Sequence, residues 1–155
     1  MTQRLNPQTV APKMLEPLLA LETYLAASGL EHSLMLLVKT RASQINGCAY
    51  CLHMHTSDAL AEGETAARLF LLDAWQESKL FTPREQAALA WTEALTHVSQ
   101  THAPVADYEA LKAHFSDTEI VNLTALIASI NSWNRISIGL RSQHPHDRPA
   151  RKAAA

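Results

Sequence analysis

Glycine is scarce in this chain, with only four residues in 155. A barrel or sandwich of β-strands needs a turn about every ten residues, and glycine is common in such turns, so its scarcity disfavours an all-β fold. Alanine and leucine are abundant instead. We therefore expect an all-α fold.

The chain also lacks an excess of charge and a long apolar run. Thirteen lysines and arginines against 15 acidic residues leave a formal net charge of −2, which provides no basic field to hold a nucleic acid. The longest strongly apolar runs, such as Leu34–Val38, are far shorter than the roughly 18 to 20 apolar residues of a membrane-spanning helix. We expect neither nucleic acid nor membrane as a partner.

The length and the 47% hydrophobic content are those of one globular domain. No internal repeat or low-complexity linker divides residues 1–141, whereas residues 142–155 are typical of a flexible, solvated C-terminal tail. The N-terminus has neither the apolar core nor the cleavage site of a signal peptide. We therefore expect one cytoplasmic domain over 1–141, in which polar residues 1–9 are loosely held.

Apolar periodicity, glycine stops and capping signals predict about seven helices. Their expected ranges are 13–27, 30–45, 48–62, 64–77, 83–98, 105–115 and 117–141. Capping boxes begin two of them, at Thr82 and Ser116. The apolar face of the first helix includes one acid, Glu22. In the helix over 64–77, the residues expected to face the core are Ala67, Phe70, Leu71, Ala74 and Trp75.

The only two cysteines, Cys48 and Cys51, open the third predicted helix. At about 100° per residue, Cys48, Cys51 and His55 fall within a stripe roughly 60° wide, which Asp58 extends by one turn. His53 falls on the opposite side of the helix. The spacing therefore selects His55 as the partner of the thiols.

This arrangement favours redox chemistry. Free N–H groups and the helix dipole stabilise a thiolate in the first turn of a helix, and by this reasoning Cys48, the more N-terminal cysteine, has the lower pKa. A second thiol three residues away can capture a sulfenic acid as a disulfide. A neighbouring imidazole such as that of His55 can take and return the proton.

Two other interpretations of the cysteines stay open. Free cysteines on a helix face are often plain packing residues. Zinc is the other possibility, but Cys48, Cys51 and His55 supply three ligands where a structural zinc site normally has four. A thioredoxin-type fold is disfavoured because no βαβ pattern precedes the motif. The polar interruption Asn131–Arg135 in the last helix is typical of satisfied core hydrogen bonds, or of a contact that pins a neighbouring helix or subunit.

Two segments carry a family resemblance. The run Arg41–Cys51 (RASQINGCAYC) with His55, and the later run Ile130–Arg135 (INSWNR), resemble the AhpD-like branch of the carboxymuconolactone decarboxylase superfamily. The resemblance covers about residues 5–141. It implies an all-α trimer or hexamer that reduces alkyl hydroperoxides with a thiol or dithiol reductant, with no cofactor and no metal. The decarboxylases of the superfamily are a poorer match, because they work without a C-x-x-C pair.

By this resemblance Cys51 attacks the peroxide, Cys48 resolves the intermediate and His55 relays the proton. The chain departs from the family pattern at three positions. Leu36 stands where relatives carry a relay glutamate, Tyr50 where they often have histidine, and His53 where they often have aspartate. We therefore expect a slow or specialised peroxidase, or one whose relay acid comes from Asp58 or from another helix. The alternative is an oligomeric redox sensor or binding scaffold without turnover.

Overall fold

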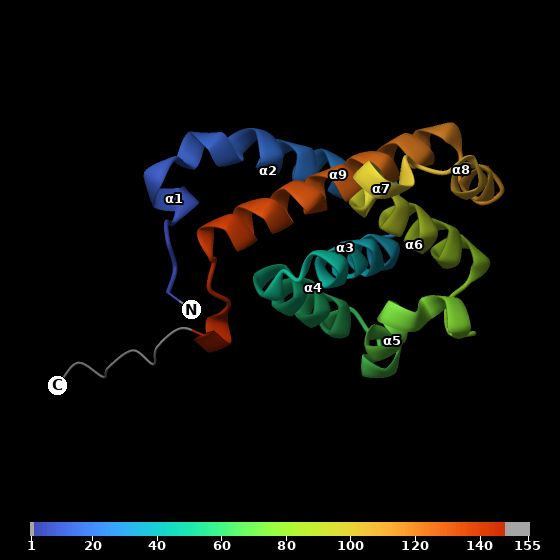
Figure 1. Cartoon of the computed structure of the whole chain (residues 1–155), viewed down its shortest axis with the longest axis horizontal. Helices are drawn as coiled ribbons and strands as arrows, with labels where there is room; N and C mark the ends of the chain where they lie inside the picture. The colour runs from blue at the N-terminus through green and yellow to red at the C-terminus, as the bar shows by residue number, and fades with distance from the viewer. Residues whose placement is uncertain (1, 148–155) are drawn as a thin grey trace.

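The computed structural model describes residues 2–147, and every regular element within them is a helix (Figure 1). The longer helices are α2 (Pro12–Ala26), α3 (His32–Asn46), α4 (Ala49–Ala61), α6 (Pro83–Thr96), α8 (Val105–Lys112) and α9 (Asp117–Leu140). The shorter elements are α1 (Pro7–Val10), α5 (Ala66–Leu71), α7 (Val98–Thr101) and the 3₁₀ helices η1 (Leu72–Glu77) and η2 (Pro145–Asp147). The predicted all-α single domain is confirmed. Within residues 2–147, no helix combines the length and the apolar content needed to cross a bilayer.

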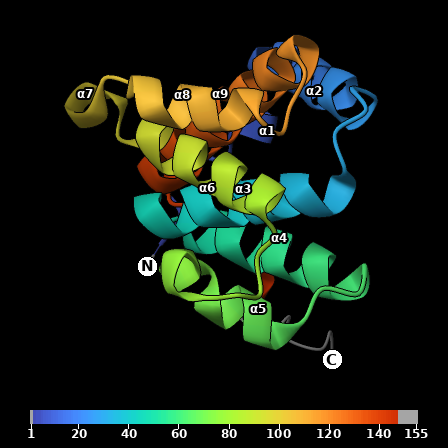
Figure 2. The ribbon, with the colours of Figure 1, turned by 90° about the vertical axis from the view of Figure 1, so that its right-hand side faces the viewer.

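Helix α3 lies at the centre of the molecule, where it packs against α4, α6 and α9 (Figure 2). In Figure 1, α2 and α9 run side by side above α3, and α4 lies below it. One apolar cluster fills the space among α2, α3, α6, α8 and α9, and a second lies among α3, α4, α5, η1 and α6. A third, small cluster joins α3, α4 and α9 and consists of Ala42, Cys48, Cys51 and Ile130.

Most predicted helix boundaries agree with the structure to within a few residues. Both capping boxes form: the Thr82 and Ser116 side chains each accept a hydrogen bond from the backbone three residues on, where a glutamate reaches back to the cap. The expected helix over 83–98 ends sooner, at Thr96, and α7 follows it after His97. These local signals therefore placed the long helices that surround α3.

The predicted helix over 64–77 is wrong in its second half. The structure has α5 followed by η1, with a departure from helical geometry at Ala74 (φ −120°, ψ 34°). The buried residues Leu69, Leu72 and Trp75 recur at every third position, which is the period of a 3₁₀ helix and not of an α-helix. Of the five residues expected to face the core only Trp75 is buried, and Phe70 is 82% exposed.

The N-terminal residues are held more firmly than predicted. The backbone N–H of Arg4 donates to the carbonyl of Leu140 at 3.0 Å, and its guanidinium donates to the carbonyl of Gly139 at 2.9 Å. Carbonyls in the last turn of a helix have no partner within the helix, so Arg4 satisfies two groups at the end of α9. The segment around Arg4 is thereby fixed beside the end of α9.

The first part of the expected tail lies against α4. Residues 142–147 include η2, and the rings of His144 and His146 lie with their centroids 5.4 Å and 4.9 Å from that of His53. The remainder of the expected tail, 148–155, lies outside the described residues.

Candidate active site

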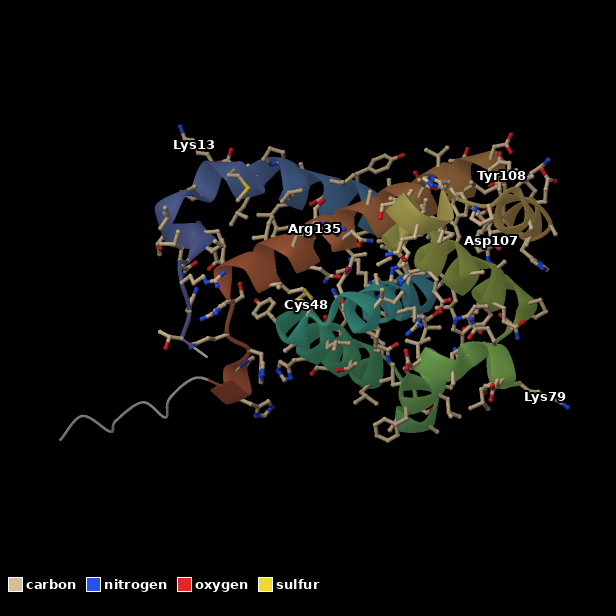
Figure 3. All side chains as sticks on the ribbon, viewed as in Figure 1. Lys13, Cys48, Lys79, Asp107, Tyr108 and Arg135 are labelled. Atoms are coloured by element: carbon tan, nitrogen blue, oxygen red, sulfur yellow. The ribbon has the colours of Figure 1, made fainter. Side chains whose placement is uncertain are left out.

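A left-handed turn places the two cysteines at the start of α4. Helix α3 ends at Gly47, whose φ of 68° is accessible to glycine at little cost. Cys48 then caps α4: its sulfur accepts a hydrogen bond from the backbone N–H of Cys51 at 3.4 Å. Figure 3 shows Cys48 below α9, close to the ends of α3 and α4. Both thiols are free and buried, with their sulfur atoms 2.7 Å apart.

The two thiols act as one hydrogen-bonded pair. The hydrogen bond from Cys51, which outweighs the effect of burial, lowers the pKa of Cys48 to about 7. The same hydrogen bond, together with burial, raises the pKa of Cys51 above its usual range. The pair therefore loses its first proton near neutral pH, and the resulting thiolate is stabilised on Cys48. This direction agrees with the dipole argument from the sequence.

His55 is buried one turn after Cys51, with 6% of its surface exposed. Burial and the nearby cation of Lys39, partly opposed by the carboxylate of Glu22, together lower its pKa to about 4. The imidazole is therefore neutral at pH 7 and able to accept a proton. Among the described residues, no other side chain forms a hydrogen bond with a ring nitrogen of His55. His53, by contrast, lies on the other face of α4 among the histidines of residues 142–147.

A pocket of about 500 Å³ opens beside Cys51 and His55. Leu36, from α3, contributes to its wall, as do apolar side chains of α2, α4 and α9, namely Leu19, Met54, Ile130 and Trp133. Cys48 lines a separate hollow of about 340 Å³ on the other side of Tyr50. Only Cys51 of the two cysteines therefore meets a substrate-sized pocket that His55 also lines.

An ion pair forms the polar wall of this pocket. Glu22 of α2 accepts a hydrogen bond from Lys39 of α3 at 2.6 Å, and its other oxygen accepts from Ser129 at 2.6 Å and from the indole N–H of Trp133 at 3.1 Å. Burial opposes ionisation of Glu22, but these donors outweigh it and hold its pKa below the usual range. The carboxylate thus stays charged in a fixed position.

Glu22 and Lys39 were not predicted as part of the site. At the relay position of the relatives, the buried side chain of Leu36 faces the pocket, and the carboxylate comes from α2 instead. Asp58 also lines the pocket, but its side chain is exposed. One signal in the sequence could have found Glu22, since it is the single acid on the apolar face of its helix.

The two motif segments of the sequence bind each other. The side-chain amide of Asn46 donates to the side-chain carbonyls of Asn131 and Asn134, both at 2.9 Å, and the amide of Asn134 donates to the hydroxyl of Ser43 at 3.0 Å. The polar interruption in α9 is thus a set of satisfied core hydrogen bonds, as its position predicted. These bonds fix α9 against the turn that carries the cysteines, and the Asn134 amide also favours the thiolate form of the pair.

Among residues 2–147, no three histidine, cysteine, aspartate or glutamate side chains are placed to hold a metal ion together. One pocket is lined by Cys51 of the dithiol, by the neutral imidazole of His55 and by a half-buried ion pair. These are the groups that proton transfer and thiol oxidation require.

The family model for the carboxymuconolactone decarboxylase family matches residues 12–94. An uncharacterised Bacillus subtilis protein, YdfG, is 39% identical over 140 residues, which are 90% of this chain and 95% of YdfG. A crystal structure of an Agrobacterium tumefaciens protein of unknown function, with a suggested antioxidant role as AhpD, is 44% identical with a TM-score of 0.90, covering 93% of this chain and 99% of that one. The debrominase Bmp8 shares the fold at 22% identity and a TM-score of 0.77, over 86% of this chain and 72% of its own. The chain belongs to the carboxymuconolactone decarboxylase family, as an AhpD-like member.

Proposed function

We propose that this protein is a thiol-dependent peroxidase that reduces organic hydroperoxides through a dithiol–disulfide cycle of Cys48 and Cys51. The observation that carries the proposal is the shared pocket: Cys51 and the neutral imidazole of His55 both line a cavity large enough for an organic hydroperoxide. The antioxidant role suggested for the A. tumefaciens relative is consistent with it. No cofactor is needed, because the electrons come from thiols.

Each step of the cycle conserves atoms and electrons. His55 takes the proton of Cys51 as the Cys51 sulfur attacks the terminal oxygen of the hydroperoxide. An S–O bond forms as the O–O bond breaks, and the leaving alkoxide takes the proton from His55 to become an alcohol. The Cys48 thiolate then attacks the sulfur of the Cys51 sulfenic acid, an S–S bond forms as the S–O bond breaks, and the departing hydroxide takes a proton from solvent to become water. An external thiol or dithiol reductant regenerates both thiols.

Contact with the pocket and the pKa values of the thiols favour different cysteines as the attacking thiol. Cys48 holds the more stable thiolate, but Cys51 faces the pocket together with His55. Attack requires contact with the peroxide, and the neutral imidazole of His55 can take the proton of Cys51 while the sulfur attacks bound substrate. We therefore assign the attack to Cys51 and the resolving role to Cys48, as the family resemblance implies.

The decisive experiment combines turnover with mass spectrometry of the cysteines. The reduced protein should consume several equivalents of cumene hydroperoxide in the presence of a dithiol reductant, and Cys51→Ser should abolish this consumption. In Cys48→Ser, one equivalent of peroxide plus a sulfenic-acid trap should label Cys51. In contrast, a single stoichiometric oxidation without turnover would identify a redox sensor, and trapping on Cys48 in Cys51→Ser at the wild-type rate would reverse the two roles.

A further inference from the structure

Lys39 is unusually buried for a lysine. Its side chain is 14% exposed, whereas lysines are almost never fully buried unless they are paired. It projects from α3 into the pocket that Cys51 and His55 line, one turn after the buried Leu36. Among the described residues that line this pocket, Lys39 is the only lysine or arginine.

Glu22 fixes the ammonium group of Lys39 in place. The ion pair is 2.6 Å long, and the Glu22 carboxylate is itself held by Ser129 and Trp133 of α9. Three helices therefore determine where the charge of Lys39 lies. Because the same donors keep Glu22 ionised, this carboxylate anchors Lys39 and is poorly suited to give or take a proton.

The proposed reaction develops a negative charge that a cation at the position of Lys39 could stabilise. When the O–O bond of a hydroperoxide breaks, negative charge develops on the oxygen that leaves with the organic group. A fixed cationic donor stabilises such a charge more strongly beside a partly buried pocket than in bulk water. An ammonium group has three N–H donors, and only one of those on Lys39 is taken by a described residue, Glu22. The other donors remain for a bound substrate.

We propose that Lys39 is a catalytic residue whose ammonium group donates a hydrogen bond to the leaving oxygen of the hydroperoxide, and that Glu22 is its positioning residue. The inference rests on the proposed peroxidase function. In this step the Cys51 sulfur gains the terminal oxygen, the organic oxygen departs as an alkoxide bound by Lys39, and the proton that His55 took from Cys51 converts it to the alcohol. Lys39 ends the step unchanged.

Leaving-group dependence tests this role directly. The rate constant for oxidation of the reduced thiols is measured in a single turnover with tert-butyl hydroperoxide, cumene hydroperoxide and peracetic acid. Lys39→Met should slow the reaction with tert-butyl hydroperoxide by about 10²-fold, because its alkoxide depends most on stabilisation. The loss should be much smaller with peracetic acid, whose acetate leaves as a stable anion. Alkylation by iodoacetamide, which releases no oxygen, should change by less than roughly threefold.

Three further variants define the contribution of charge and position. Lys39→Arg keeps the cation and should retain most of the rate, whereas Lys39→Gln keeps a donor without the charge and should follow Lys39→Met. Glu22→Gln releases the ammonium group and should give an intermediate loss with the same leaving-group dependence. The control is Lys79→Met, an exposed lysine far from Cys48 (Figure 3). Thermal unfolding identifies any variant that fails to fold, and Lys39→Gln replaces Lys39→Met if that happens.

The proposed function and the role of Lys39 can fail separately. An equal slowing of all peroxides and of iodoacetamide in Lys39→Met and Lys39→Gln would show that Lys39 acts on the thiols or on the shape of the pocket, which overturns the inference. A wild-type protein that reacts once without turnover would overturn the peroxidase function, while the single-turnover leaving-group dependence would still decide the role of Lys39.

Discussion

At the scale of single residues, the charge state of His55 depends on what surrounds it in space. Burial favours the neutral ring, and the nearby cation of Lys39 acts in the same direction. The spacing of Cys48, Cys51 and His55 along one helix was visible in the sequence because all three belong to one periodic element. Lys39 was not visible as a site residue, and Glu22 stood out only as an acid on an apolar face, because nothing local to α2 or α3 shows which helix these residues will face.

The low pKa of His55 predicts a pH dependence of stability. An unfolded histidine titrates near 6.5 but His55 near 4, so between these values the unfolded chain binds more protons, and the free energy of unfolding falls as the pH falls. The loss over this window is about 3 kcal/mol for this one group. In His55→Gln the difference in unfolding free energy between pH 6.5 and pH 4 should shrink by that order.

Urea denaturation at a fixed protein concentration measures this difference. His97→Gln, which replaces an exposed histidine at the end of α6, is the matched control. If His55→Gln loses as much stability on acidification as the wild type does, His55 is not the neutral group described above.

At the scale of elements, the reliable signals were those that act within one turn. Capping residues and a left-handed glycine fixed helix ends correctly, because each satisfies backbone groups a few residues away. The segment over 66–77 departed from expectation because η1 follows α5 with three residues per turn, which brings Leu72 and Trp75 inward in line with Leu69 of α5. Tertiary contacts support this winding: the Trp75 indole N–H donates to Glu93 of α6 at 2.7 Å.

Substitution by alanine should have opposite effects on protein stability at Gly47 and at Gly139. A Cβ at Gly47 or at Gly139 would meet nothing within 4 Å, so only the backbone conformation differs. Gly47 has a φ of 68°, and Gly47→Ala should destabilise the protein by about 1 kcal/mol. Gly139 lies within α9, and Gly139→Ala should stabilise it by about 0.5 to 1 kcal/mol.

Equilibrium unfolding of both variants measures whether Gly47→Ala destabilises the protein and Gly139→Ala stabilises it. Because Gly47 precedes Cys48, Gly47→Ala should also slow alkylation of the thiols, whereas Gly139→Ala should not. Equal destabilisation by both substitutions would contradict the role given to the left-handed turn.

At the scale of the whole molecule, several large apolar side chains remain exposed. They include Phe70, Tyr24 and Ile138, the last with 44% of its surface exposed on α9. Apolar surface of this kind is often covered in an oligomer. We expect a homo-oligomer, as the family resemblance implies.

Light scattering at micromolar concentration measures the mass of the assembly. We expect three or six copies of the 17.1 kDa chain. A clean monomer over a range of concentrations would contradict this expectation.

The sequence by itself determined the long helices, the position of the dithiol and the choice of His55 over His53, because these depend on periodicity and on caps within a few residues. The tertiary structure decided which groups meet across the pocket. Glu22 and Lys39 lie on the consecutive helices α2 and α3, Trp133 lies on the distant α9, and the packing of α9 against α2 and α3 brings the three side chains to one pocket. Contacts between helices depend on how whole faces fit one another, so no local pattern placed this ion pair beside His55.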